Sequence, residues 1–482
     1  MKNLKKFLAL GMAAAMAIGV TACGGNSGST SANAGGSESK AEGGEETKGA
    51  DNNGGKRDLT IGSWYVQYYD SSHTKLEDDP NYAGDLASQL KFDNVKKIEE
   101  KYNVTLKWVN LTYNGTRESI NNSILAGTPD CDIYLVDTSM AVPAQANGLC
   151  TDLKTVLPAD DDLFTTQNNV SYIDLGDGKA CILSRVEKAK TVEATYPLAF
   201  NVQMIKDAGL EDPRDLWEKG EWTWDKFIEY CKVLTKDKDG DGATDQYGFA
   251  GYGVEIFREL MMSNGGSIAT GKTETLSSNA VGEALKMMQD MFNTYKVCYP
   301  YEDDEKVMRY AYRNGNVGFW PGAAWIMSTN NDYDATGSTG VTLEFDTAFV
   351  RWPVGPSGNK DTNAGKNASG GEYYIIPANV EDPALVYHVL YDYWNWYDGD
   401  TTVRDSEEAL AWWYTTTGKD PDYQNSNFDV MYDCGMHLTL DLYDSIGVEY
   451  DITGVINGTV TPAQFQETYK QPVQDALDNL FS

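Results

Sequence analysis

Basic residues are scarce in this chain of 482 residues. It has 39 lysines and arginines against 72 aspartates and glutamates, so its formal net charge is −33 at pH 7. Binding to nucleic-acid phosphates needs a basic face, which this composition does not supply. The charge therefore argues against a nucleic-acid partner and against strongly anionic ligands. It is compatible with neutral or cationic ligands, and much of it is expected to lie on a solvated surface.

Histidines and paired cysteines are also few. The three histidines, His73, His388 and His437, lie far apart and in no recognisable catalytic motif, so a Ser-His-Asp or Cys-His active site has no support. None of the seven cysteines lies in a C-x-x-C pair, so no zinc site is indicated. Six cysteines follow Cys23 and fall three in each of the two lobes predicted below, so some are expected to be free, buried thiols: Cys131, Cys150, Cys181, Cys231, Cys298 and Cys434.

Long apolar runs are absent except at the N-terminus. Three lysines precede the run Phe7–Val20, which has about the length of a signal-peptide core and falls short of the roughly 20 residues of a membrane span. The following Val20–Cys23 resembles a bacterial lipobox, in which the chain is cut before the cysteine and the cysteine carries lipid. The alternative is an ordinary secretory signal. We expect 1–22 to be a lipoprotein signal peptide and Cys23 to anchor the protein to the extracytoplasmic face of the cell membrane.

Apolar and aromatic residues are nearly missing from the segment that follows. Residues 23–56 are mostly small and polar and contain no aromatic side chain. A segment with so little to bury is expected to be a flexible tether. The roughly 425 residues beyond it are too many for one ordinary core and indicate two domains.

Aromatic side chains, by contrast, are plentiful. The chain has 12 Trp and 30 Tyr, and aromatics make up 12% of it. Carbohydrate-binding surfaces use such residues because the C–H faces of sugars pack on aromatic rings while hydroxyls take polar partners. A large two-domain protein also has many core aromatics, so composition alone leaves both interpretations open.

Strand and helix patterns alternate along the body. The first part predicts strands near 58–64, 104–109 and 132–136, separated by helices over 85–102 and 115–126. This order favours an α/β domain with a largely parallel sheet. Further strands are predicted at 194–201, 247–250, 316–320 and 371–377, with helices at 224–234, 254–263, 280–295, 383–396, 405–414 and 462–480.

Five motifs in a fixed order resemble the extracellular solute-binding proteins of ABC importers, in the sugar-binding group called family 1. One motif departs from the usual form, since Val202 stands where a lysine usually follows the asparagine. The five segments are Gly127–Val136, Gln145–Leu153, Tyr196–Leu210, Glu221–Lys226 and Gly315–Trp325. No single motif is decisive, but their order together is specific.

The resemblance implies a two-lobed, periplasmic-binding-protein-like α/β fold with a hinge and an interlobe ligand cleft. Carried onto this chain, it places lobe 1 at 57–195 plus 314–350 and lobe 2 at 196–313 plus 351–482. It implies a monomer that captures a carbohydrate and delivers it to the permease subunits of an ABC transporter. Such a protein is not an enzyme and does not bind nucleic acid.

An acidic loop carries the sharpest local motif. Acidic side chains at positions 1, 3, 5 and 9, a glycine at 6 and a backbone carbonyl at 7 have the spacing of an EF-hand-like calcium loop, although position 12 is Gly248 instead of glutamate. The alternative is a polar turn between a helix and a strand. The sequence predicts a structural calcium ion held by Asp237, Asp239, Asp241, Ala243 and Asp245, with Gln246 as a further oxygen donor. Some binding proteins for alginate-derived oligosaccharides in the resembled family have a similar loop.

Residues that follow predicted strands are the candidate ligand contacts, because α/β sheets bind ligands beyond the carboxyl ends of their strands. Trp325 is the first choice, since the resembled family places an aromatic platform there. For each candidate, a structural role is the alternative. The full set is Trp325, Trp64, Tyr65, Asp137, Tyr252, Glu372 and Tyr373.

Two other function classes stay open at this stage. The ligand can be a peptide, a polyamine or another solute that is not a sugar. The chain can also be a lipid-anchored enzyme that acts on glycans, because paired carboxylates are abundant among its 72 acidic residues and therefore uninformative.

Overall fold

The computed structural model describes residues 55–64, 69–79, 84–193, 195–322, 343–362, 371–415, 421–437 and 440–482. These belong to one compact unit, Gly54–Ser482. The predicted signal peptide, Cys23 and the tether up to residue 54 lie outside the described residues, as do the candidate ligand contacts Tyr65 and Trp325. Within the described ranges, no helix is both long and apolar enough to cross a bilayer.

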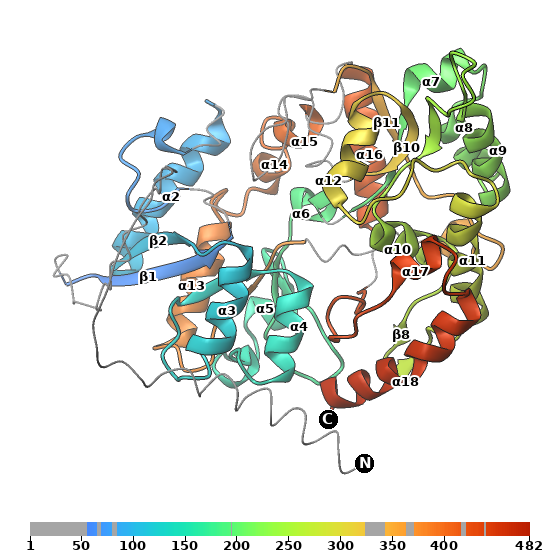
Figure 1. Ribbon diagram of the computed structural model, residues 1–482. Helices are drawn as coiled ribbons and strands as arrows, with labels where there is room; N and C mark the ends of the chain where they lie inside the picture. The colour runs from blue at the N-terminus through green and yellow to red at the C-terminus, as the bar shows by residue number, and fades with distance from the viewer. Residues whose placement is uncertain are drawn as a thin grey trace, which may run out of the picture. The chain divides into compact units, whose positions relative to one another are not determined.

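The first sheet has six strands in the order β2-β1-β3-β12-β5-β4, and its strands β1 and β2 are labelled in Figure 1. Strand β1 pairs in parallel with β2 and β3, whereas β12 runs antiparallel to both β3 and β5. The strands are β1 (Arg57–Ser63), β2 (Val104–Asn110), β3 (Ile133–Val136), β4 (Val170–Tyr172), β5 (Leu183–Arg185) and β12 (Tyr373–Ile375).

Alternation along β3 explains how helices cover both faces of this sheet. Successive side chains of a strand point to opposite faces. Ile133 and Leu135 belong to a buried cluster with residues of α2 and α13, whereas Tyr134 and Val136 belong to a cluster with residues of α3 and α4. The helices are α2 (Leu86–Tyr102), α3 (Tyr113–Ser123), α4 (Thr138–Ala146) and α13 (Pro383–Trp394).

The second sheet has four strands in the order β11-β6-β10-β7. Strands β10 and β7 are parallel, and β6 runs antiparallel to β10 and β11. Phe200 and Phe319 pack on one face with α9 and α10, and Ala199 and Trp320 on the other with α12 and α16. The strands are β6 (Leu198–Asn201), β7 (Tyr247–Phe249), β10 (Val317–Pro321) and β11 (Thr347–Val350).

Helices surround this second sheet, and most are amphipathic segments with a polar N-cap. Asn201, Asp212 and Thr223 each accept a backbone N–H at the start of α7, α8 and α9, which satisfies part of the unpaired first turn. The helices are α7 (Val202–Asp207), α8 (Pro213–Lys219), α9 (Trp224–Leu234), α10 (Gly253–Ser263), α11 (Asn279–Asn293), α12 (Glu305–Arg313), α16 (Pro421–Gly435), α17 (Ile452–Ile456) and α18 (Pro462–Leu480).

Short elements complete the described chain. The predicted helix over 405–414 is wrong in its extent, since the structure has two short helices with a turn between them, α14 and α15. The remaining elements are α5 (Asp162–Thr165), α6 (Lys188–Glu193), β8 (Ala269–Thr270), β9 (Thr273–Glu274), α14 (Thr401–Arg404), α15 (Ala411–Thr415) and the 3₁₀ helices Leu76–Asp78, Leu153–Thr155 and Lys360–Thr362.

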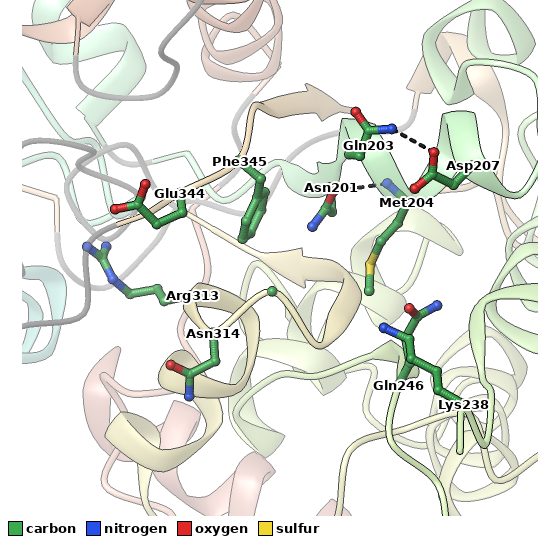
Figure 2. A pocket seen from close by; sticks show the side chains of 11 residues that line it. Asn201, Gln203, Met204, Asp207, Lys238, Gln246, Arg313, Asn314, Glu344 and Phe345 are labelled. Atoms are coloured by element: carbon green, nitrogen blue, oxygen red, sulfur yellow. Dashed lines mark hydrogen bonds between the residues drawn. The ribbon is translucent and has the colours of Figure 1, made fainter. Parts of the chain in front are cut away.

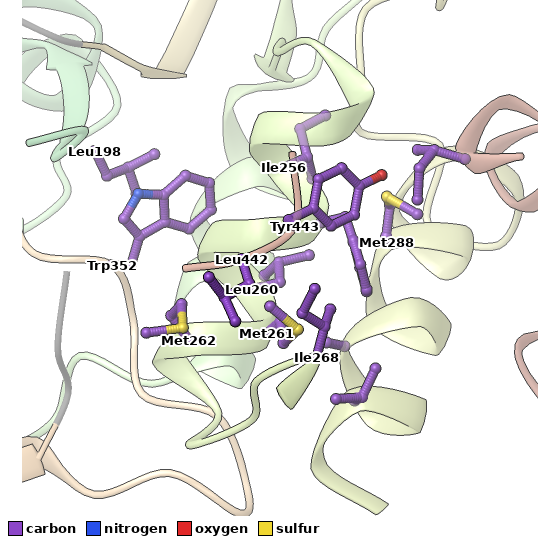
Figure 3. Close-up of a cluster of buried hydrophobic side chains, with 14 of the residues drawn as sticks. Leu198, Ile256, Leu260, Met261, Met262, Ile268, Met288, Trp352, Leu442 and Tyr443 are labelled. Carbon is purple, nitrogen blue, oxygen red and sulfur yellow. The ribbon is translucent and has the colours of Figure 1, made fainter. Parts of the chain in front are cut away.

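The core of the second lobe packs around α10. Figure 3 shows Ile256, Leu260 and Met261 of this helix facing Tyr443 and Met288 from segments far along the chain. The same helix carries Arg258, only 2% exposed, which is paired with Asp441 and Asp444. The C-terminal segment is thereby tied to the lobe by both apolar burial and a buried ion pair.

The strands are distributed between the lobes differently from the predicted boundaries. The prediction puts 314–350 in lobe 1, but β10 and β11 hydrogen-bond to β6 in the second sheet. It puts 351–482 in lobe 2, but β12 pairs with β3 and α13 packs on α2 in the first lobe. The chain therefore crosses between β5 and β6, returns between β11 and β12, and leaves again after α13. Sequence order fixes none of this, because strand partners are chosen by register and packing.

The expectation of free thiols is confirmed. All six cysteines in the described part of the chain are buried, and none of them forms a disulfide. Burial raises the pKa of the Cys231 and Cys298 thiols well above the ordinary range. These thiols act as small apolar core groups.

Candidate ligand-binding site

Four predicted ligand contacts lie at one edge of the first sheet. Trp64 follows β1 and Asp137 follows β3, and these parallel strands end at the same edge. Strand β12 is antiparallel, with Tyr373 opposite Val136, so Glu372 and Tyr373 begin at that edge too. We call these four residues, together with Tyr113, the first edge. It is the position at which α/β sheets bind ligands.

Asp137 holds protein groups at this edge. It is the N-cap of α4, and its Oδ1 accepts the Met140 N–H at 3.1 Å and the Ser139 hydroxyl at 2.6 Å. Its Oδ2 accepts the Tyr113 hydroxyl at 2.6 Å. The side chain is only 2% exposed, and burial raises its pKa. Asp137 was predicted as an acceptor for sugar hydroxyls, but its geometry makes it a positioning residue for Tyr113.

Tyr113 is a residue that sequence reasoning missed. It is the first residue of α3, is 41% exposed, and packs edge-on against Trp64 with ring centroids 5.7 Å apart. The Arg117 guanidinium lies 5.5 Å from its ring centroid. Burial and the charge of Asp137 raise the pKa of Tyr113 to about 12, so its hydroxyl stays protonated. Its place just after β2 was the available signal, because the connection after a parallel strand is where ligand contacts gather.

Glu372 and Tyr373 both have charged protein partners. Glu372 is 8% exposed and lies 2.7 Å from Arg185 Nη2, and Arg185 Nη1 lies 2.9 Å from Glu187. Two effects oppose each other at Glu372: burial raises its pKa to about 8, whereas Arg185 favours the ionised form. Lys190 Nζ lies 4.3 Å from the ring centroid of Tyr373. Both predicted residues thus contact protein cations, and their contact with a ligand stays a prediction.

Tyr252 lies at the equivalent edge of the second sheet. It follows β7 and is the N-cap residue of α10. Nearby, the Tyr301 hydroxyl donates to Asp303 at 3.2 Å. Burial, followed by the charge of Asp303, raises the pKa of Tyr252. We call Tyr252, Tyr301 and Asp303 the second edge; it combines phenolic hydroxyls with a carboxylate.

The acidic loop forms a compact turn between α9 and β7. Ligand oxygens of Asp237, Asp239 and Asp245 all lie within 4.8 Å of one another. Asp237 accepts the Gly242 and Gly240 N–H groups at 2.9 and 2.6 Å, and these hydrogen bonds lower its pKa. Three carboxylates gathered in this way are a donor set suited to a hard cation.

The other predicted metal ligands differ in position. Asp241 accepts the Ala243 N–H at 2.7 Å. Gln246 is 6% exposed, and its side-chain nitrogen donates to the Leu234 carbonyl at 2.6 Å. This hydrogen bond joins the end of α9 to β7, so Gln246 has a structural role that the sequence pattern did not indicate.

The family model described as "Bacterial extracellular solute-binding protein" matches residues 83–397. No curated protein matches the chain closely enough in sequence to count as a relative.

Several solved structures share the fold at low sequence identity. The maltose/maltodextrin-binding domain MalE from Bdellovibrio bacteriovorus, bound to maltotriose, has a TM-score of 0.56 at 14% identity over 87% of this chain and 100% of its own. The GacH receptor of Streptomyces glaucescens, solved unliganded and with acarbose, has a TM-score of 0.56 at 13% identity, over 88% and 99%. UgpB from Mycobacterium tuberculosis, in complex with glycerophosphocholine, has a TM-score of 0.53 at 16% identity, over 89% and 100%.

These structures confirm the two-lobed, periplasmic-binding-protein-like α/β fold, and they are binding proteins. The family model matches more than half of the chain, and the strands are arranged as in that fold. The chain therefore belongs to the bacterial extracellular solute-binding protein family.

Proposed function

We propose that this protein captures a neutral oligosaccharide between its two lobes and delivers it to the permease subunits of an ABC importer. The observation that carries the proposal is the aromatic pair Trp64–Tyr113 at the first edge, with the Tyr113 ring exposed and its hydroxyl held by Asp137. An exposed, rigid aromatic surface matches the C–H face of a sugar ring.

The division of roles follows from which polar groups are already committed. Asp137 and Glu372 are bonded to protein partners, so they fix side chains and leave the aromatic faces to the ligand. Tyr252 and Tyr301 supply phenolic hydroxyls from the other lobe for the ligand's own hydroxyls. A ligand that contacts both edges favours the closed arrangement of the lobes over the open one.

Trp325 and Tyr65 remain part of the proposal. Both lie outside the described residues. Tyr65 follows Trp64 directly in the sequence, and Trp325 comes after β10. We propose that they add further aromatic contacts to the same ligand.

A melting-temperature screen tests the ligand class, because a ligand that binds only the folded chain raises its stability. Neutral oligosaccharides are expected to raise the melting temperature. Tyr113→Ala is expected to weaken binding of the best oligosaccharide about tenfold or more in calorimetry. The matched control is Leu125→Ala, a surface change at a residue that is 73% exposed.

Three results would overturn all or part of this proposal. Unchanged affinity in a folded Tyr113→Ala protein removes the first edge from the site. Stabilisation by a peptide or a polyamine, with none by any carbohydrate, replaces the ligand class and keeps the importer role. Product release from a glycan panel would favour the lipid-anchored enzyme instead.

We also propose that Cys23 carries lipid and anchors a monomeric protein outside the cytoplasm. Support comes from the lipobox pattern and from membership of an extracellular family. Cys23→Ala is expected to move the protein from the membrane fraction to the soluble fraction. Full retention of that variant on membranes would contradict the proposal.

For the acidic loop we propose a structural calcium ion. Support comes from the three clustered carboxylates at the junction of α9 and β7. Calcium is expected to raise the melting temperature relative to chelator, and Asp239→Asn is expected to remove that response. Glu221→Gln, an exposed acid outside the loop, is the control. Identical melting of the parent protein with calcium and with chelator would exclude the site.

A further inference from the structure

A pocket lies at the end of the second sheet that is opposite to the end at Tyr252. Strand β6 runs from Leu198, opposite Pro321 at the carboxyl end of β10, to Asn201, opposite Thr347. Asn201 is therefore at the other end of the sheet. A cavity of about 650 Å³ opens there, beside the starts of β7, β10 and β11. We call it the distal pocket.

Two buried primary amides present unused groups to this pocket. Asn201 is 3% exposed, and its Oδ1 caps α7 by accepting the Met204 N–H at 3.1 Å. Among the described residues, its Nδ2 has no acceptor. Gln246 is 6% exposed and donates its nitrogen to Leu234, which leaves its Oε1 without a donor in the described part of the chain. Neither atom is among the side-chain atoms that are both fully buried and unbonded, so both reach the open space of the pocket. A donor and an acceptor are therefore available there to a polar ligand.

Apolar groups line the space beside these amides. Figure 2 shows the Phe345 ring on one side of Asn201 and the Met204 thioether on the other. The Phe345 ring is held by an edge-on contact with Tyr312, 5.3 Å between centroids. Gly315, at φ +77°, adds no side chain to the wall, and a Cβ there would sit 3.7 Å from the Phe345 ring. The ring face is thus left open to the pocket.

The charged groups of the pocket are of both signs. Asp207 accepts the Gln203 amide at 2.6 Å, and Arg313 and Glu344 point toward each other in Figure 2. Lys238 adds a positive charge from the acidic loop. Two cations and two anions give no net charge, which favours a neutral ligand over an anion or a cation.

We propose that the distal pocket binds a small, neutral, polyhydroxylated ring compound such as a single pyranose. Its hydroxyls, which both donate and accept, pair with Asn201 Nδ2 and Gln246 Oε1. Its C–H face packs on Phe345. This site is separate from the two edges and does not depend on the ligand bound between the lobes.

The test uses methyl α-D-glucopyranoside as the probe, titrated by saturation-transfer NMR on the whole protein. A Tyr113→Ala background isolates the distal pocket from the first edge. In that background the probe is expected to bind. Asn201→Asp keeps the acceptor that caps α7 but removes the donor, and it is expected to weaken probe binding about threefold to tenfold. Phe345→Leu is expected to weaken it by a similar factor.

The matched control is Asp400→Asn, the reverse exchange of side chains at the N-cap of α14. It is expected to leave probe binding unchanged. Absence of probe binding in the Tyr113→Ala background overturns the proposal, as does binding that survives both Asn201→Asp and Phe345→Leu. If Asn201→Asp does not fold, Phe345→Leu decides. Loss of oligosaccharide binding in Tyr113→Ala with retained probe binding separates the two sites.

Discussion

The two edges proposed to contact the ligand differ in the groups that they present. At the first edge, each carboxylate is bonded to a protein group: Asp137 to Tyr113 and Glu372 to Arg185. At the second edge, Asp303 also has a protein partner, because it accepts the Tyr301 hydroxyl, and two phenolic hydroxyls, those of Tyr252 and Tyr301, lie beside it. The first edge therefore offers a fixed aromatic surface, and the second offers hydrogen-bonding groups. This difference suggests that affinity depends mainly on the first edge and choice among ligands on the second.

The lobes also differ in how they bury charge. Arg258 and Asp441 are each 2% exposed on the side chain, deep in the second lobe. The side chains of Arg185 and Glu372 are 12% and 11% exposed, and Glu372 lies at the first edge. The Arg258–Asp441 pair lies in the core and stabilises the fold, whereas the Arg185–Glu372 pair is near enough to the surface to respond to pH.

The largest expected effect is on the buried pair of the second lobe. Arg258→Met leaves Asp441 buried without its cation and is expected to reduce the free energy of unfolding by about 3–5 kcal/mol. Urea denaturation measures it. Arg214→Met, which breaks a more solvent-accessible pair with Asp212, is the control and is expected to cost about 1 kcal/mol or less. Equal losses in the two variants would show that the pair is not the anchor of this lobe.

The first edge gives the next largest effect, on affinity. Trp64→Ala removes the ring that packs against Tyr113 and is expected to weaken oligosaccharide binding about tenfold. Calorimetry measures the change. Trp108→Phe is the control, because that indole bonds to Tyr393 within the first lobe. A larger loss of affinity in Tyr252→Ala than in Trp64→Ala would reverse the comparison of the two edges.

A smaller effect isolates the anchoring of Tyr113. Tyr113→Phe keeps the ring but removes the hydroxyl that donates to Asp137. Affinity is expected to fall about threefold, because one hydrogen bond contributes about 1 kcal/mol or less and the Trp64 contact remains. An affinity equal to that of the parent would mean that Trp64 alone positions the ring.

The smallest effect is the pH dependence of the first lobe. Burial raises the pKa of Glu372 from its ordinary value of 4.5 to about 8. Between these values the folded chain holds a proton that the unfolded chain releases, so stability falls as pH rises. Glu372→Gln is expected to flatten that slope in melting curves. A parent protein whose stability stays constant over this window would show that Arg185 dominates and keeps Glu372 ionised.

Much of the fold was predictable, and the reasons are local. Alternating apolar residues mark β1, β2 and β3, and motif order identifies the family that the family model confirms. The free thiols were also predictable by counting. The edges were predictable in part: Trp64, Asp137, Glu372 and Tyr373 do meet at one edge because they flank strands.

The missed features are long-range. Tyr113 is one of 30 tyrosines. Its place after β2 is a signal in the sequence, but the Asp137 hydrogen bond and the Trp64 ring that set it apart are tertiary contacts. The lobe assignment of β10, β11 and β12 depends on which strand each one pairs with. Neither property leaves a mark in the neighbouring sequence.

The sequence by itself determined the class of this protein: a two-lobed α/β binding protein with an acidic loop, buried thiols and aromatic residues after its strands. Those features depend on residue type, periodicity and motif order, which are properties of neighbouring residues. Only the tertiary structure decided that Asp137 caps a helix and holds Tyr113, that Gln246 joins α9 to β7, and that Asn201 and Gln246 share a pocket. The physical reason is that hydrogen-bond partners and strand register are set by packing between distant segments.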